Sequence, residues 1–107
     1  MRSVNKFYGM LGLATKAGKT VFGAESVAKS VKSGKALLVI ADPGLSQRSM
    51  KDTVSMCEFY ETELIVPCSE GAAGHACGKP DIRLIGITDR NFAAKLIELR
   101  EYAEVQI

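Results

Sequence analysis

The sequence of 107 residues has few of the residues that build metal centres and disulfide frameworks. It contains three cysteines and one histidine, and no two cysteines form a C-x-x-C pair. A structural zinc site needs closely spaced Cys and His ligands, and the nearest group, Cys68, His75 and Cys77, lacks that spacing. We therefore expect no metal site, and free, buried thiols at all three cysteines, including Cys57.

Long apolar segments are also missing. The longest uninterrupted apolar run, 36–41, is far shorter than the roughly 20 residues that cross a bilayer. After Met1 and Arg2, no apolar stretch leads to a small-residue cleavage site of the kind that ends a signal peptide. We therefore expect a cytoplasmic protein without a membrane span.

Charge of one sign does not dominate, because 14 Lys and Arg stand against 12 Asp and Glu. With 47% hydrophobic residues, the composition differs from that of disordered segments and predicts one folded domain over 1–107. The charge is unevenly distributed, since residues 1–35 hold seven basic residues and a single acid, Glu25. This pattern predicts a basic surface suited to a polyanion, although a solvated lysine-rich helix face would have the same sequence pattern.

Helical and extended patterns alternate along the chain. The predicted helices cover 3–18, 24–34, 46–60, a short helix or turn within 69–78, and 89–103; the predicted strands cover 20–22, 36–41, 64–66 and 82–88. Ser3, Ser46 and Asp89 are the predicted N-caps. The third helix would turn Met50, Val54, Cys57 and Tyr60 inward. This alternation is typical of an α/β fold, here a three-layer αβα sandwich with a four-stranded mixed sheet and helices on both faces.

Two catalytic motifs fail on spacing or context. Gly18-Lys19-Thr20 resembles the end of a phosphate-binding loop, but five residues rather than four separate it from Gly12, and it follows a helix instead of a strand. The only histidine, His75, lies two positions from Cys77, so the two side chains would point to different sides of a helix. We expect no enzyme; a small enzyme using Cys68, His75 or Cys77 remains the alternative.

The start of the second predicted helix, 23–29, lies inside the basic third of the chain. Free N–H groups and the helix dipole attract anions at a helix N-terminus. Lys29 and Lys32 would share one face of this helix, while Lys16 and Lys19 precede the strand that leads into it. Such lysines suit a phosphate backbone, and a lysine can also donate to the O6 and N7 acceptors of guanine.

In their order and spacing, these segments resemble the kink-turn RNA-binding superfamily of large-subunit ribosomal proteins (the L-seven-Ae and L-thirty-e family), most closely its small stand-alone bacterial members. The resemblance covers nearly the whole chain. It rests on Gly18-Lys19, on the G-x-x-x-x-x-K pattern of Gly23 to Lys29, on the strand and turn of 37–43, on the small-residue stretch 74–79, and on the strand exit 85–89.

This resemblance implies a non-enzymatic domain without a cofactor that binds a sharply bent RNA internal loop with tandem sheared G·A pairs, as a ribosome-associated and monomeric protein. The family reads the G·A edges with a G-x-[NK]-[EQ]-x-x-K pattern at the start of helix two, and packs an L-G-x-A loop before helix four against bulged nucleotides. The implied RNA-binding residues are Gly23, Glu25, Ser26 and Lys29 from the first pattern, Ala73, Gly74 and Ala76 from the second, and Lys19 and Lys32 as phosphate contacts.

Three positions depart from the family pattern. Glu25 stands where a neutral or basic donor is usual, Ser26 where a long acceptor is usual, and Ala73 where leucine is usual. A second interpretation therefore stays open, in which the same fold serves as a protein-protein interaction adaptor that has lost RNA binding. An adaptor should tolerate the loss of Lys29 and Lys32, whereas an RNA complex should weaken steeply with salt.

Overall fold

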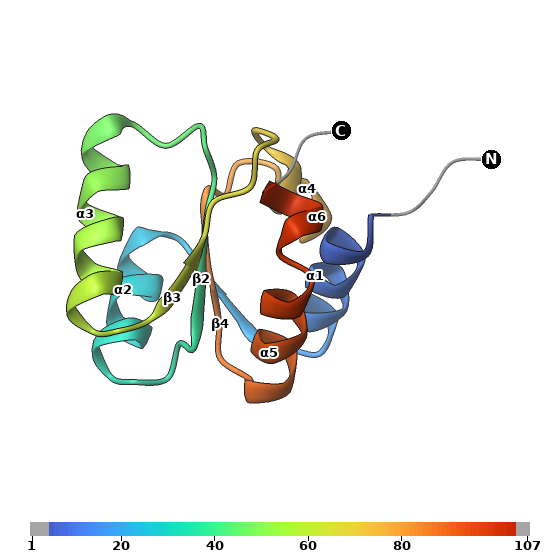
Figure 1. Ribbon diagram of the computed structural model, residues 1–107, viewed down its shortest axis with the longest axis horizontal. Coiled ribbons are helices and arrows are strands. Elements are labelled where there is room, and N and C mark those ends of the chain that lie inside the picture. Colours follow the sequence, from blue (N-terminus) through green and yellow to red (C-terminus); the bar gives the residue numbers. More distant parts are fainter. Residues whose placement is uncertain (1–4, 105–107) are drawn as a thin grey trace.

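The computed structural model describes residues 5–104, which form one sheet flanked by helices (Figure 1). In chain order the elements are α1 (Lys6–Lys16), β1 (Thr20–Phe22), α2 (Ala24–Lys32), β2 (Leu38–Ala41), α3 (Gln47–Phe59), β3 (Glu63–Ile65), α4 (Ala72–Ala76), β4 (Leu84–Ile87), α5 (Arg90–Glu98) and α6 (Glu101–Glu104). The predicted four-stranded α/β fold is confirmed. Within residues 5–104, no helix is long and apolar enough to cross a membrane.

The four strands form a mixed sheet in the order β1-β4-β2-β3. β4 runs antiparallel to both β1 and β2, and β2 runs parallel to β3. Strands β1, β2 and β3 therefore all point in one direction and end where β4 begins. We call this the carboxyl end of the sheet, and three connections meet there: the start of α2, the turn after β2 and the loop before α4.

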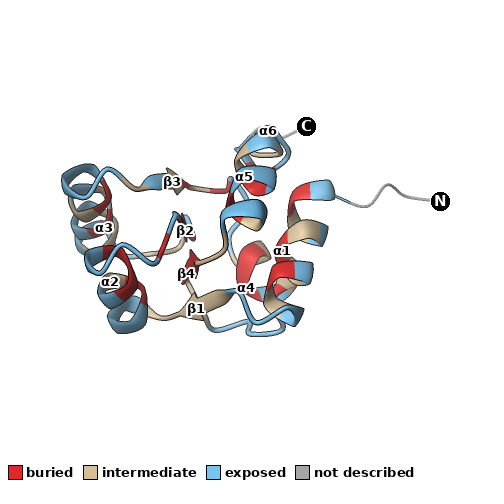
Figure 2. Cartoon of the chain, turned by 90° about the horizontal axis from the view of Figure 1, so that it is seen from below, coloured by how far each residue is buried: buried red, intermediate tan, exposed pale blue. Residues whose placement is uncertain are grey.

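Helices cover both faces of the sheet, with α2 and α3 on one side and α1, α4, α5 and α6 on the other (Figure 1). Every residue of β2 and β4 is buried, and alternate residues serve opposite faces: Leu38 and Ile40 pack in the cluster of α1 and α5, and Val39 packs in the cluster of α2 and α3. Figure 2 shows buried residues on the helix faces that look toward the sheet. Apolar runs without polar alternation are what a sheet covered on both faces requires.

The first helix begins later than its sequence suggests. Its N-cap is Asn5, whose side-chain oxygen accepts hydrogen bonds from the backbone N–H groups of Phe7 (2.9 Å) and Tyr8 (3.4 Å). The prediction of Ser3 as the cap is therefore wrong, and Ser3 itself lies outside the described residues. Ser46 and Asp89 are confirmed as caps, since each accepts a backbone N–H bond from the third residue after it.

The predicted single helix over 89–103 is two helices, α5 and α6, with a break at Leu99 and Arg100. The guanidinium of Arg100 donates to the backbone oxygen of Leu64 at 3.1 Å and to Glu63 at 3.4 Å, so it contacts the edge strand β3. Cys68 N–H also donates to the carbonyl of Ala103. These tertiary contacts hold α6 over the edge strand, and they explain why the helix does not continue straight.

Two predictions about buried side chains are wrong. Tyr60 is not an inward residue of α3, because 40% of it is exposed, and Thr53 is buried instead. The Thr53 hydroxyl donates to the backbone oxygen of Ser49 at 2.8 Å, which satisfies this polar group inside the helix layer. All three cysteines are free, and Cys57 and Cys77 are buried as expected, but Cys68 is exposed.

Candidate nucleic-acid interface

The backbone at Gly23 sets the entry into α2. Gly23 has φ 93° and ψ 157°, a conformation that side-chain-bearing residues rarely adopt. Its N–H donates to the carbonyl of Leu84 in β4 at 3.0 Å, and its own carbonyl accepts the N–H of Val27 at 2.9 Å. A Cβ placed on Gly23 would meet nothing within 4 Å. Glycine is therefore required here by the dihedral angle, and the backbone is open to close approach by a partner.

The outer face of α2 carries the side chains that the family pattern assigns to RNA. Glu25, Ser26, Lys29 and Lys32 are all exposed, because the apolar stripe of the helix is buried against the sheet. A shallow groove of about 430 Å³ runs beside the helix and is lined by Val21, Ser26, Lys29, Ser30, Ser33 and Lys35. The structure thus brings Ser26 and Lys29 together, and it adds Lys35, a cation absent from the predicted set.

Two further lysines flank the edge strand β1. Lys19 is exposed just before the strand, where its carbonyl accepts the N–H of Thr88 at 3.0 Å. The Nζ of Lys79 lies 5.1 Å from the centre of the Phe22 ring, within the range of a cation-π contact. Because Phe22 directly precedes Gly23, Lys79 adds a cation near the start of α2 that no local sequence pattern indicated.

The structure places Ala73, Gly74 and Ala76 inside α4, so their predicted position in a loop before helix four is wrong, and all three contribute to packing. Ala73 and Gly74 are buried, and Ala76 packs against the same core. A Cβ on Gly74 would lie 2.6 Å from the carbonyl oxygen of Ile82 and 2.7 Å from that of Lys79, so only glycine fits. These residues therefore pack α4 against the core and against the turn that follows it, and the exposed surface here is formed by neighbouring residues such as Glu70 and His75.

A buried carboxylate holds that loop in place. Asp42 follows β2 and is only 1% exposed. Its Oδ1 accepts the backbone N–H of Gly71 at 2.7 Å, and its Oδ2 accepts the N–H of Gly44 at 2.8 Å and a guanidinium N–H of Arg83 at 2.8 Å. The sequence indicates only a strand and turn over 37–43, because the most distant partners of Asp42 lie 29 and 41 residues away.

The same end of the sheet connects the two predicted RNA-binding elements. Gly23, at the start of α2, donates its N–H to Leu84, and Asp42, which holds the loop before α4, donates its N–H to the adjacent Arg83 at 2.9 Å. Both elements are therefore anchored to neighbouring residues at the beginning of β4. The geometry gives one surface at the carboxyl end of the sheet, with a glycine-opened backbone, exposed lysines and a fixed loop.

A second hollow lies beside that loop, between α1 and α4. It measures about 690 Å³ and is lined by Asn5, Tyr8, Gly9, Glu70, Gly71, Ala72, His75, Ala76 and Pro80. The Tyr8 hydroxyl is buried, and it has no hydrogen-bond partner within residues 5–104. Burial, and to a smaller degree Cys68 and Asp42, raises the pKa of this phenol. The hydroxyl therefore stays neutral at physiological pH and is able to donate a hydrogen bond.

The groups considered for catalysis are differently placed. His75 is exposed, whereas Cys77 is buried, and burial raises the pKa of the Cys77 thiol, although Thr15 and Lys79 partly oppose that shift. A raised pKa reduces the thiolate fraction that a nucleophile needs. Among the described residues, no three His, Cys, Asp or Glu side chains lie close enough together to hold a metal ion.

Comparison with known proteins agrees with this architecture. The model of the ribosomal protein L7Ae/L30e/S12e/Gadd45 family matches residues 5–97. The RNA-binding protein YlxQ of Bacillus subtilis is 31% identical over 94 residues, which cover 88% of this chain and 94% of YlxQ. The large ribosomal subunit protein eL30 of Sulfurisphaera tokodaii is 32% identical, with 97% of this chain and 100% of eL30 covered.

Solved structures share the fold. A protein of unknown function from Bacillus halodurans C superimposes with a TM-score of 0.86 at 31% identity, covering 92% of this chain and 99% of its own. A 15.5kD RNA binding protein of Giardia lamblia superimposes with a TM-score of 0.74 at 21% identity, over 88% of this chain and 83% of its own, which supports the fold alone. The family match over 5–97 and these alignments show that the chain belongs to the ribosomal protein L7Ae/L30e/S12e/Gadd45 family, which confirms the resemblance seen in its sequence.

Proposed function

We propose that this chain is a non-enzymatic RNA-binding protein, associated with the ribosome, that recognises a kink-turn or a similarly bent RNA. The observation that carries the proposal is the common anchoring of two elements to β4, because Gly23 and Asp42 bond to the adjacent carbonyls of Leu84 and Arg83. The names of the relatives support it, since YlxQ is called an RNA-binding protein and eL30 a ribosomal protein.

The start of α2 would read the bent duplex. Gly23 leaves the backbone open to a base or phosphate, and Lys29, exposed on the same helix, would donate to the O6 and N7 acceptors of a guanine. Lys19 and Lys32 would neutralise phosphates, as the family pattern implies. Lys35, which lines the same groove as Lys29, adds a further phosphate contact.

The departures at Glu25 and Ser26 fit this arrangement in a specific way. The Glu25 carboxylate accepts hydrogen bonds only, so beside RNA it must face a base amino group rather than a phosphate. Ser26 has a shorter reach than the usual long acceptor, and it lies in the groove that Lys29 and Lys35 also line. A water molecule or a closer base would bridge the shorter distance, as happens in many protein-nucleic acid interfaces.

The loop before α4, together with α4 itself, would contribute the shape of the RNA-binding surface. Because Ala73 and Gly74 are buried, their role in RNA binding would be to fix the backbone, while Asp42 holds the loop through Gly71. Ala73 lacks the larger apolar surface of the usual leucine. The bulged nucleotides would therefore pack on a flatter surface here than in family members that carry leucine.

The test is a salt titration of binding to a short kink-turn RNA, beside the same RNA with its G·A pairs replaced by Watson-Crick pairs. Selective binding that weakens steeply with salt is expected, because phosphate contacts release counterions. Equally weak binding to both RNAs would contradict the proposal and would favour the protein adaptor.

Single substitutions distinguish contacts to bases from contacts to phosphates. Lys29→Ala should weaken binding to the kink-turn RNA by about 1 to 3 kcal/mol, as loss of a base contact does, whereas Lys32→Ala should weaken both RNAs alike and reduce the salt slope by about one. Lys95→Ala is the matched control, since this exposed lysine lies on α5, on the other side of the sheet. Unchanged affinity of Lys29→Ala at matched salt would refute the role of Lys29.

A further inference from the structure

An aromatic pair lies exposed at the end of α3. Phe59 is 78% exposed, the largest exposure among the large hydrophobic side chains of the described residues, and Tyr60 beside it is 40% exposed. Their ring centres lie 4.9 Å apart in an edge-to-face arrangement. Large aromatic side chains that stay in water are typical of interaction sites, because their burial against a partner is strongly favourable.

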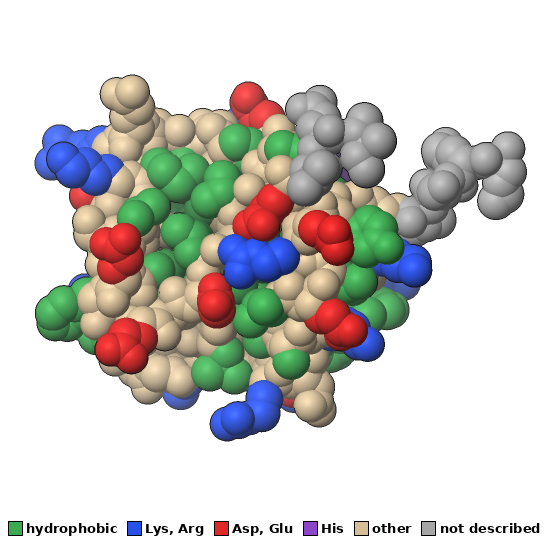
Figure 3. Space-filling view, in the orientation of Figure 1, with side chains coloured by type: hydrophobic (Ala, Val, Ile, Leu, Met, Phe, Trp, Pro, Cys, Tyr) green, Lys and Arg blue, Asp and Glu red, His purple; other side chains and the backbone are tan. Residues whose placement is uncertain are grey.

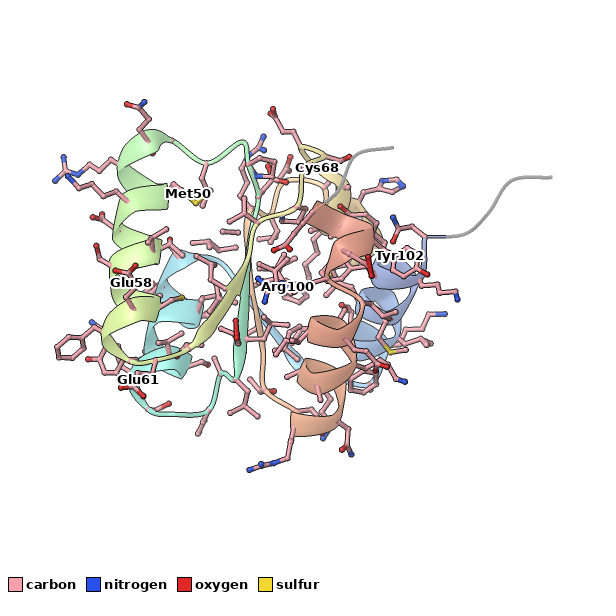
Figure 4. The ribbon with its side chains drawn as sticks, viewed as in Figure 1. Met50, Glu58, Glu61, Cys68, Arg100 and Tyr102 are labelled. Atoms are coloured by element: carbon pink, nitrogen blue, oxygen red, sulfur yellow. The ribbon has the colours of Figure 1, made fainter. Side chains whose placement is uncertain are left out.

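Glu58 and Glu61, which flank this pair in the sequence, line a groove between the end of α3 and the edge strand β3. It measures about 370 Å³ and is lined by Val54, Cys57, Glu58, Glu61, Thr62, Glu63 and Leu64. Figure 3 shows hydrophobic side chains between α3 and β3, with acidic side chains around them. In Figure 4, Glu58 and Glu61 lie on the outer side of this end of α3. The groove therefore has an apolar floor and an acidic rim.

The acidic rim is largely uncompensated. Glu63 pairs with Arg100 at 3.4 Å, but Arg100 also bonds Glu104 at 3.0 Å. Within residues 5–104, neither Glu58 nor Glu61 takes part in an ion pair, and no Lys or Arg lines the groove. This surface therefore offers negative charge to a partner together with exposed apolar area.

We propose that the aromatic pair Phe59–Tyr60 and the acidic groove bind a basic, amphipathic helical segment of another protein. Charge complementarity selects a cationic partner. RNA does not fit, because the rim carboxylates repel phosphates. A second copy docked through this same surface does not fit either, because Glu58 and Glu61 of the two copies would face each other and repel.

The edge strand itself indicates how the segment docks. The outward carbonyl of Leu64 already accepts a hydrogen bond from Arg100 at 3.1 Å, so β3 is blocked at this position for a partner that would add a strand. A helix laid in the groove needs no backbone pairing and anchors through its apolar face. Its basic face would then meet Glu58 and Glu61.

The probe is a synthetic helical peptide of leucine and lysine with one tryptophan, compared with a leucine-glutamate peptide of the same pattern. This chain has no tryptophan, so tryptophan fluorescence reports on the peptide alone. The Leu/Lys peptide should shift the amide resonances of residues 54–64, and its binding should weaken as salt rises. The Leu/Glu peptide should leave these resonances unchanged.

Substitutions then locate the contact. Phe59→Ala and Glu58→Lys should each weaken the Leu/Lys peptide on the order of tenfold, as loss of an interface anchor does. Tyr102→Ala and Glu101→Lys are matched controls, because both residues are exposed on α6, and they should change nothing. Thermal unfolding of each variant checks that the fold is intact.

Three results would overturn this inference: shifts spread over the whole surface, equal binding of both peptides at residues 54–64, or concentration-dependent dimers in sedimentation that Phe59→Ala abolishes. The first two would remove the specific site, and the third would make a second copy the occupant. RNA binding by Phe59→Ala should be unchanged, so this test succeeds or fails independently of the proposed function.

Discussion

Replacing Asp42 by alanine should destabilise the protein more than replacing any exposed acid. The carboxylate is 1% exposed and accepts three hydrogen bonds, from the backbone N–H groups of Gly44 and Gly71 and from the guanidinium of Arg83. Alanine offers no acceptor, so all three donors lose their partner. The perturbation therefore acts on the turn after β2 and on the loop before α4 together.

The expected loss of stability depends on how far each hydrogen-bond donor is exposed to water. The side chain of Arg83 is 41% exposed, so water replaces much of its bond, and its contribution is small. Each backbone bond to a charged acceptor contributes about 1.5 to 3 kcal/mol. Because the desolvation cost of the buried carboxylate also disappears, we expect the free energy of unfolding to fall by about 3 kcal/mol, and by roughly half of that for Asp42→Asn, which keeps one acceptor oxygen.

Urea unfolding of the two variants measures this loss, with Asp52→Ala as the control, because Asp52 is an exposed acid on α3. Amide hydrogen exchange should show faster exchange at Gly71 in Asp42→Ala, since that N–H loses its partner. A loss below about 0.5 kcal/mol, as at ordinary surface positions, together with unchanged exchange at Gly71, would refute the role given to Asp42.

Two further predictions concern packing and thiol reactivity. Gly74→Ala should lower the free energy of unfolding by about 1 to 3 kcal/mol, because the new Cβ would lie 2.6 and 2.7 Å from two backbone oxygens; an unchanged urea midpoint would contradict this packing. Burial raises the pKa of Cys57 to about 11, so at pH 8 this thiol stays protonated and should react with iodoacetamide far more slowly than the exposed Cys68. Peptide mass spectrometry measures the extent of alkylation at both cysteines. Equal labelling rates in the folded protein would contradict the burial of Cys57.

Local patterns in the sequence predicted most of the secondary structure, because each signal acts within a few residues. The apolar run of 36–41 contains β2, and Ser46 and Asp89 cap their helices as expected. The break between α5 and α6 was not predictable in this way. Its cause is a set of bonds from Arg100 to a strand 36 residues earlier in the chain, and apolar periodicity carries no record of such a contact.

The candidate site divides along the same line. Ser26 and Lys29 are exposed one turn apart on α2, and Gly23 is the N-cap of the same helix, so a short motif is able to indicate all three. Asp42 and Lys79 reach the site through strand order and loop packing. The burial of Ala73 was also not predictable from the small-residue stretch, since alanine occurs both on surfaces and in cores.

The order of strands also determines when the protein can be completed during synthesis. β1 and β2 have no direct pairing, and β4 joins them from between. In a growing chain, β1 therefore cannot join the sheet of β2 and β3 before residues 84–87 have left the ribosomal exit tunnel. The backbone hydrogen bonds of Gly23 and Asp42 also form only after the start of β4 has been made, because they are accepted by the carbonyls of Leu84 and Arg83. The surface proposed to bind RNA is thus complete only after β4 has joined the sheet. We therefore expect RNA binding to require the completed fold and to be absent from unfinished chains.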